Sequence, residues 1–183
     1  ARKAAADCAV LLKNDNGTLP LKKGVSLAII GSWAEKPVFQ GTGCAIVKAK
    51  KIDSPLEEIK KYTDKVVYAK GYVNPKQIDE ELINEAVKAA EKSDFAVIFA
   101  GAVLPPETDN YNRTDLSVEK AQLEIINRVS RVNPNTVVVL MNCESVVMPW
   151  IDNVPAVLDM WYSGQGCGDA VAKLLFGDKN PGG

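Results

Sequence analysis

The segment of residues 101–113 carries the densest group of side chains able to do chemistry. Its last seven residues read Glu107-Thr108-Asp109-Asn110-Tyr111-Asn112-Arg113. Two carboxylates this close can serve general acid–base catalysis, in which one group gives and later takes a proton. Acidic residues two apart in an extended loop point in opposite directions, so only one of Glu107 and Asp109 is expected to face a shared site. The alternative is a solvated acidic loop that Arg113 ties down by a surface ion pair, worth about 0–1 kcal/mol.

The chain contains no histidine. This excludes Ser-His-Asp and Cys-His catalysis and His-ligated metals, so acid–base chemistry must use carboxylates, Lys, Tyr or Cys. The cysteines are scattered without a Cys-x-x-Cys pair, which argues against a zinc ribbon or thioredoxin-type site. We therefore expect no metal and no cofactor, and we expect the thiols to be free and buried. They are Cys8, Cys44, Cys143 and Cys167.

A short glycine motif, Gly41-Thr42-Gly43, allows a phosphate-loop interpretation. It lacks the rest of a Gly-x-Gly-x-x-Gly pattern and no Gly-Lys-Ser/Thr follows, so a tight turn is favoured. The tryptophans are candidates for stacking on a ligand ring. We expect Trp150 and Trp161 to lie in the core and Trp33, just past a predicted strand, to be more exposed.

Short apolar runs alternate with amphipathic helical stretches and must position these side chains. Residues 95–100 and 136–141 are apolar on both faces, which is typical of central strands in a covered parallel sheet. Further strands are predicted at 25–30, 66–69 and 156–161. This order predicts one α/β domain with a mainly parallel sheet.

The helices have recognisable ends. Ser54, before Pro55 and Leu56, and Ser117 are predicted N-caps, and Gly177 is predicted to end a last helix over 169–176. One further helix is predicted from an apolar stripe made of Ile78, Leu82, Ala86 and Ala90.

Ligands of open α/β sheets bind outside the carboxyl ends of the strands. In this chain those ends lead into connections rich in Gly, Pro and Asn, which we expect to converge on one edge and to hold the site. These connections are residues 31–43, 101–114, 142–150 and 163–168.

The composition is that of an ordinary soluble globular chain of 183 residues, 46% hydrophobic and 25% charged, with a net charge of −1. Near-neutral charge without a Lys/Arg patch argues against a nucleic-acid partner. No apolar stretch reaches the roughly 18 residues of a membrane span, so no membrane association is expected. The first residues lack the apolar core of a signal peptide. We therefore expect a cytoplasmic protein, with an upstream signal peptide as the open alternative.

Several motifs occur in an order that spans nearly the whole chain. They are residues 9–14, Gly17-Thr18-Leu19-Pro20-Leu21, residues 148–158, Trp161-Tyr162-Ser163-Gly164-Gln165 and residues 175–181. Together they resemble the second, C-terminal domain of family 3 glycoside hydrolases, typically β-glucosidases and β-xylosidases. The resemblance implies a three-layer α/β/α sandwich over residues 1–183, with a mainly parallel, roughly six-stranded sheet. It also implies that the (β/α)8 barrel carrying the family's aspartate nucleophile is absent from this chain.

The resemblance assigns roles to the acidic loop. The family's acid/base is the second glutamate of a Glu-Ser-Glu-Gly-Tyr/Phe-Asp-Arg motif, and Asp109 falls on that position. Glu107 falls on the preceding glutamate and is the second catalytic candidate, while Tyr111 and Arg113 are implied to bind substrate.

The same loop departs from the family motif at three positions. Asp109 stands for glutamate, Asn110 for glycine and Asn112 for the aspartate that would pair with Arg113. An aspartate is one methylene shorter, and a misplacement near 1 Å costs on the order of 100-fold in rate.

A second loop, residues 39–44, resembles one that borders the family's sugar pocket. This implies substrate-binding roles for Gln40, Gly41, Thr42 and Gly43. Cys44 stands where some relatives carry an aromatic residue that stacks on glucose.

The function implied is the acid/base-bearing domain of a retaining β-glycosidase, whose partners are a β-linked oligosaccharide or glycoside and a barrel in cis or in trans. We expect the isolated chain to be inactive. Two alternatives stay open: a non-catalytic sugar-binding or structural module with a drifted acid/base loop, and a small flavodoxin-like binder of nucleotide or flavin.

Overall fold

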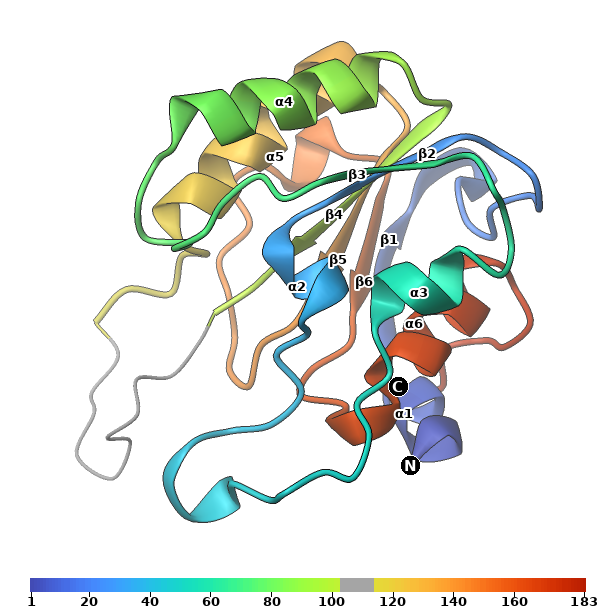
Figure 1. The fold of residues 1–183 in the computed structure, drawn as a ribbon, viewed down its shortest axis with the longest axis vertical. Coiled ribbons are helices and arrows are strands. Elements are labelled where there is room, and N and C mark those ends of the chain that lie inside the picture. Colours follow the sequence, from blue (N-terminus) through green and yellow to red (C-terminus); the bar gives the residue numbers. More distant parts are fainter. Residues whose placement is uncertain (103–113) are drawn as a thin grey trace.

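The computed structural model describes residues 1–102 and 114–183 (Figure 1). The described residues form a six-stranded sheet with the strand order β1-β6-β5-β4-β2-β3. The strands are β1 (Val10–Asn14), β2 (Leu27–Ile30), β3 (Val66–Ala69), β4 (Phe95–Ala100), β5 (Thr136–Leu140) and β6 (Ala156–Asp159). All neighbouring pairs are parallel except β1 and β6, in which Val10 lies opposite Asp159.

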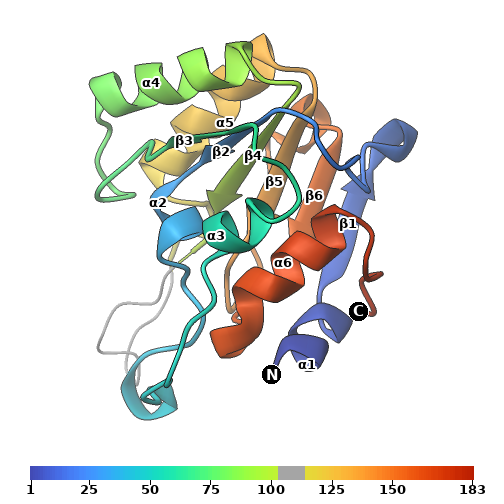
Figure 2. The same cartoon turned by 45° about the vertical axis from the view of Figure 1, so that its right-hand side comes forward.

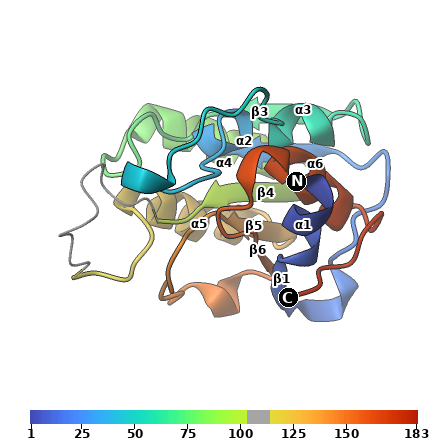
Figure 3. The ribbon, with the colours of Figure 1, turned by 90° about the horizontal axis from the view of Figure 1, so that it is seen from below.

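Helices cover both faces of this sheet, as Figures 2 and 3 show. One face carries α4 (Glu80–Glu91) and α5 (Lys120–Val132), and the other carries α1 (Arg2–Asp7), α3 (Pro55–Ile59) and α6 (Cys167–Leu175). A short helix, α2 (Ser32–Glu35), directly follows β2. Single 3-10 turns complete the described chain: η1 (Asp15–Gly17), η2 (Gly43–Ala45), η3 (Ile151–Asn153) and η4 (Gly164–Gly166). The predicted three-layer α/β/α architecture is confirmed.

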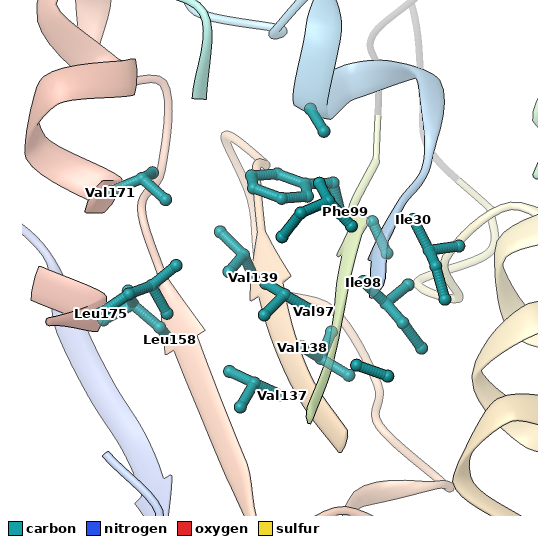
Figure 4. Close-up of a cluster of buried hydrophobic side chains, with 14 of the residues drawn as sticks. Ile30, Val97, Ile98, Phe99, Val137, Val138, Val139, Leu158, Val171 and Leu175 are labelled. Carbon is teal, nitrogen blue, oxygen red and sulfur yellow. The ribbon is translucent and has the colours of Figure 1, made fainter. Parts of the chain in front are cut away.

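The core is centred on β4 and β5, whose residues are buried with the single exception of Phe95 at the start of β4. Figure 4 shows their side chains in one buried apolar cluster, with Leu158 of β6 beside Leu175 of α6. Full burial of one such side chain stabilises a fold by about 1.5–3 kcal/mol. These apolar strands therefore fix the scaffold on which the loops are carried.

The strand predictions hold with small corrections at their ends. The strands expected at 66–69 and 95–100 match β3 and β4, while β2, β5 and β6 are one or two residues shorter than expected. β1 was not predicted. It is an edge strand that pairs antiparallel with β6 and is interrupted between Leu11 and Lys13, so its local pattern is weak.

One predicted serine cap is confirmed in its position, without a capping bond from its side chain, and the other is wrong. Ser54 occupies the N-cap position of α3, but its hydroxyl donates to the Ala34 carbonyl at 3.1 Å instead of capping the helix. Ser117 lies outside α5, whose N-cap position is Glu119. At α3 a tertiary partner, the Ala34 carbonyl, therefore replaces the local capping bond.

The helix α4 begins later than its apolar stripe suggested. Its N-cap is Asp79, which accepts from the Leu82 N–H at 3.2 Å. Ile83 is buried in place of Leu82, and Ile78 is exposed before the helix. The predicted stop after α6 is confirmed, because Gly177 adopts a φ of 76°.

The helices α1, α3 and α6 pack around a set of ion pairs, which we call the helix-side cluster. Arg2 donates from Nε to Asp53 at 2.7 Å, and Asp169 pairs with Lys173 at 2.9 Å. Gly168 of α6 approaches the chain so closely that an added Cβ would lie 2.5 Å from the Asp53 carbonyl oxygen. Within the described ranges, no helix has the length and apolar character needed to span a membrane.

Candidate functional site

The segments that follow the parallel strands gather at one edge of the sheet, at the lower side of Figure 1. We call this the carboxyl edge. Two glycines with positive φ leave the strands there: Gly31 after β2 at 109° and Gly101 after β4 at 150°. An added Cβ on Gly101 would lie 2.1 Å from the Met141 carbonyl oxygen, so no other residue fits the observed backbone at this exit. The predicted convergence of the connections is confirmed for their described residues.

The four predicted carbohydrate-binding residues of the first connection lie together in one loop. Gln40 is bound to Val47 twice: its Nε2 donates to the Val47 carbonyl at 3.3 Å, and its Oε1 accepts the Val47 N–H at 3.2 Å. Gly43 adopts a φ of 62°, which confirms a turn that needs backbone freedom. Thr42 precedes η2, and its carbonyl accepts the Ala45 N–H at 3.3 Å. The amide of Gln40 therefore closes the loop on itself.

A hollow of about 340 Å³ separates this loop from the segment after β6. The Gly164 N–H donates to the Phe39 carbonyl at 2.8 Å and ties the two segments together. Of the predicted residues, Gln40 and Gly41 line the hollow, and Thr42 and Gly43 do not. Its lining consists of Phe39, Gln40, Gly41, Ala45, Val47, Ala49, Tyr162, Gly164 and Gln165.

The predicted catalytic residues Glu107 and Asp109, with Tyr111 and Arg113, lie outside the described residues. The chain that leads into their loop is described as far as Ala102. Its carbonyl accepts the Tyr162 hydroxyl at 3.1 Å. This bond connects the start of that loop to the segment that lines the hollow.

A buried aspartate at the end of β6 was missed by the sequence analysis. Asp159 is 4% exposed, and its carboxylate accepts the Trp161 N–H at 2.9 Å. Burial raises the pKa of Asp159, while hydrogen bonds from the Trp161 backbone and the Asn142 side chain oppose that rise. The sequence signal that could have identified Asp159 is a charged residue at the end of an otherwise apolar strand.

The tryptophan predictions are correct for one residue and reversed for two. Trp150 is buried, as expected, at 1% exposure. Trp33 is also buried and meets the Tyr72 ring edge-on at 6.2 Å, whereas Trp161 is 38% exposed. Trp161 also adopts a φ of 53°, a left-handed conformation uncommon outside glycine. Trp161 follows β6 at the carboxyl edge and is exposed there, although its sequence context predicted a core position.

The cysteine prediction also needs correction. All four thiols are free, but only Cys167 is buried, and Cys8 and Cys44 are exposed. Burial raises the pKa of Cys167 to about 12, so its thiol stays protonated at neutral pH. Among the described residues, no group of three or more Cys, Asp or Glu side chains is arranged to hold a metal ion.

The geometry defines an α/β/α domain with a loop-lined hollow at the carboxyl edge of its sheet, and comparison with known proteins gives its family. The chain belongs to the glycosyl hydrolase family 3 C-terminal domain family, whose model matches residues 9–183. It is a domain of the kind found in family 3 β-glucosidases.

Individual relatives agree with this assignment. The chain is 48% identical to the thermostable β-glucosidase B of Acetivibrio thermocellus, over 100% of this chain and 25% of that protein. It is 32% identical to an exo-α-(1→6)-L-arabinopyranosidase of Bifidobacterium longum, over 100% of this chain and 26% of that protein. A solved family 3 β-glucosidase of Bifidobacterium adolescentis superposes with a TM-score of 0.91 at 32% identity, over 98% of this chain and 27% of its own. The chain thus spans about a quarter of the length of these relatives.

Proposed function

We propose that this chain is the acid/base-bearing domain of a retaining β-glycosidase that hydrolyses terminal β-linked sugars when a (β/α)8 barrel supplies the nucleophile. The observation that carries the proposal is its 48% identity, over the whole chain, to a β-glucosidase of which it covers 25%. Most of that relative's length is therefore left for other domains. The barrel could be joined to this chain or supplied by a separate subunit.

In the proposed reaction, a carboxylate of the barrel attacks the anomeric carbon while Asp109 protonates the leaving glycosidic oxygen. A covalent glycosyl-enzyme and a free alcohol result. Asp109 then takes a proton from water as the water oxygen attacks the anomeric carbon, which releases the sugar and restores both carboxyl groups. Glu107 is the alternative acid/base. Either acid needs a raised pKa, which removal from water at the barrel interface would supply.

The described residues support this location in two ways. The loop that carries Asp109 leaves β4 at the carboxyl edge, the edge at which ligands bind in α/β sheets. The hollow lined by Gln40, Gly41 and Tyr162 lies at the same edge, and Tyr162 bonds the start of that loop. A sugar seated between the barrel and this hollow would therefore lie near Ala102, from which the acidic loop continues.

The test is hydrolysis of nitrophenyl glycosides by the chain alone and by the chain joined to a family 3 barrel. The panel contains a β-glucoside, a β-xyloside, an N-acetyl-β-glucosaminide and an α-L-arabinopyranoside, because the relatives' names differ in sugar. We expect no turnover from the chain alone. In the joined protein, Asp109→Asn should lower kcat about 10²–10⁴-fold, the usual contribution of a general acid–base group. Glu107→Gln is the matched control, and a loss confined to Glu107→Gln would transfer the role to that residue.

A chemical rescue makes this test specific. A dinitrophenol leaving group needs no protonation, so Asp109→Ala should retain the first step on a dinitrophenyl glycoside and lose the second. Azide needs no base to attack, and it should restore turnover and yield a β-glycosyl azide. Turnover of the panel by the isolated chain, or full activity of Asp109→Asn and Glu107→Gln in the joined protein, would contradict the proposal.

The second candidate is a non-catalytic sugar-binding or structural module. The observation in its favour is the triple departure from the family motif at Asp109, Asn110 and Asn112. Asp109→Glu in the joined protein separates the two functions. An acid/base site still in use should gain activity from the longer side chain, up to the order of 100-fold for a correction near 1 Å, whereas a module should show no change.

A further inference from the structure

A buried chain of hydrogen bonds joins two backbone groups at the end of β4. The Tyr72 hydroxyl donates to the Phe99 carbonyl at 3.1 Å and accepts from Gln122 Nε2 at 3.3 Å. Gln122 Oε1 in turn accepts the Gly101 N–H at 3.1 Å. Both Tyr72 and Gln122 have 0% exposure. The two side chains therefore bridge the backbone on either side of Ala100, at the point where β4 gives way to the loop.

The topology explains why these two backbone groups need side-chain partners. Phe95 donates its N–H to Ser26, so the odd-numbered residues of β4 bond toward the β2 side, and Met141 bonds Ala100 from the β5 side. β2 ends at Ile30, where Gly31 turns the chain away with a φ of 109°. The Phe99 carbonyl and the Gly101 N–H thus extend beyond the last strand partner on their side. Without Tyr72 and Gln122 they would be buried and unpaired, at a cost of about 1–3 kcal/mol each.

We propose that Tyr72 and Gln122 are positioning residues, which fix the start of the acidic loop and thereby the placement of the carboxylate that protonates the glycosidic oxygen. This inference rests on the proposed function. Gln122 lies on the buried face of α5 with the apolar Ala121 and Ile125, where an aliphatic residue would pack without needing a partner. A buried polar pair lowers the stability of the fold unless each of its polar groups is hydrogen-bonded. Here the pair forms hydrogen bonds with the backbone at the end of β4.

The same exit is held from its other side. Tyr162 donates its hydroxyl to the Ala102 carbonyl at 3.1 Å, so Gly101 and Ala102 are each held by a different part of the chain. Near-attack geometry tolerates little displacement, because a shift near 1 Å lowers rates on the order of 100-fold. Loosening the start of the loop should therefore lower kcat by a larger factor than it raises KM, because the expected sugar-binding residues Gln40 and Gly41 lie on another segment, while Tyr111 and Arg113 lie in the loop itself.

The test uses Tyr72→Phe and Gln122→Leu, which remove one or both hydrogen-bonding partners with little change of shape. Tyr68→Phe is the matched control, because the Tyr68 hydroxyl is shielded and has no hydrogen-bond partner among the described residues. Gln122→Glu is the conservative variant, since it keeps an oxygen that can accept the Gly101 N–H. Each variant is made in the 183-residue chain and in the chain joined to a family 3 barrel.

Two measurements give the result. In the 183-residue chain, amide hydrogen exchange at Gly101 should accelerate at least about tenfold in Tyr72→Phe and Gln122→Leu, a loss of about 1.4 kcal/mol of local protection. Met141, whose N–H bonds Ala100 from the β5 side, is the internal reference and should be unchanged. In the joined protein, kcat should fall about tenfold or more, by a larger factor than KM rises. Gln122→Glu should restore most of the lost kcat, and Tyr68→Phe should match the parent.

The outcomes separate this inference from the proposed function. Unchanged exchange at Gly101, or unchanged kcat in a joined protein that Asp109→Asn and Glu107→Gln inactivate, would overturn the positioning role. An equal loss of kcat in Tyr68→Phe would also overturn it, because the effect would then be general. If neither acidic-loop variant lowers activity, the proposed function fails and the catalytic consequence fails with it. Exchange at Gly101 would still decide whether the pair holds the backbone.

Discussion

Two buried aspartates, one in the helix-side cluster and one at the carboxyl edge, have opposite electrostatic surroundings. Asp53 is 5% exposed and accepts hydrogen bonds from Arg2 at 2.7 and 3.1 Å, and these bonds lower the pKa of its carboxyl. Asp159 is 4% exposed, and burial raises the pKa of its carboxyl group. No described Lys or Arg forms an ion pair with it that would oppose this rise. The first carboxylate stabilises the packing of helices. The second carboxyl group has no cationic partner among the described residues and lies beside the loops of the candidate site, and such a perturbed pKa is typical of functional regions.

The two shifts act on stability in opposite directions as pH changes. The lowered pKa of Asp53 contributes stability above the unfolded value of about 3.9, and this is lost as the pH falls through the folded pKa. The raised pKa of Asp159 contributes stability at acidic pH, and this is lost as the pH rises through its folded pKa. At neutral pH, Asp53 therefore stabilises the chain and Asp159 destabilises it.

The largest expected effect on stability comes from adding a Cβ atom at a glycine that lies against the backbone, one in each of the two regions. Gly101→Ala should destabilise the chain by about 3 kcal/mol or more, because its Cβ would meet the Met141 carbonyl oxygen at 2.1 Å and φ is 150°. Gly168→Ala in the helix-side cluster, with 2.5 Å to the Asp53 carbonyl oxygen and no positive φ, should cost less, about 1–3 kcal/mol. Urea unfolding measures both. Gly164→Ala, with no atom within 4 Å of the added Cβ at a φ of 72°, is the control, with an expected loss of about 1–2 kcal/mol. Equal losses in all three variants would mean that the close backbone contacts at Gly101 and Gly168 do not determine the cost.

The next effect is the loss of the Arg2 contact. Asp53→Asn should lower the free energy of unfolding at pH 7 by about 1 kcal/mol, a value limited by the solvent exposure of Arg2. It should also flatten the decline in stability on acidification below about pH 4. Chemical unfolding between neutral and acidic pH tests both. A parallel pH curve for the variant and the parent would show that the ion pair contributes nothing.

Asp159→Asn should have the opposite sign. An amide oxygen still accepts the Trp161 N–H but carries no buried charge, so the variant should be more stable at neutral pH. The expected gain is up to about 1 kcal/mol, or about 2–4 °C in Tm for a chain of this size. The gain should vanish on acidification, where Asp159 itself becomes neutral. Destabilisation of the variant at pH 7 would mean that the charge is bonded better than its burial suggests.

The smallest effect on stability is expected at Trp161. Because its ring is 38% exposed, Trp161→Phe should change the free energy of unfolding by less than about 0.5 kcal/mol. The same variant should remove most of the fluorescence quenching by acrylamide, since Trp33 and Trp150 are buried at 7% and 1% exposure. Trp150→Phe is the control and should leave the quenching largely intact while costing more stability. Persistent quenching in Trp161→Phe would contradict the exposure reported at the carboxyl edge.

Local sequence patterns predicted the elements that can be recognised from their own residues, without knowledge of the segments that pack against them. β4 and the first five residues of the β5 prediction were identified because a short, unbroken apolar run rich in β-branched residues favours a strand that is covered on both faces. The turn at Gly177 was predicted because a helix end needs a left-handed residue. In contrast, β1 was missed because its pairing with β6 joins residues more than a hundred positions apart, as in Val10 and Asp159.

The sequence by itself determined the α/β architecture, the edge at which the strand connections converge and the family resemblance, because these depend on apolar periodicity and on motifs that are continuous in the chain. Tertiary structure alone decided which tryptophan is exposed, which residues occupy the helix N-caps, and which polar side chains form hydrogen bonds with one another. Tyr72 and Gln122 are 50 residues apart and each resembles an ordinary core position in isolation. Their partnership exists because β2 ends before β4 does, which leaves two buried backbone groups that no local pattern could reveal.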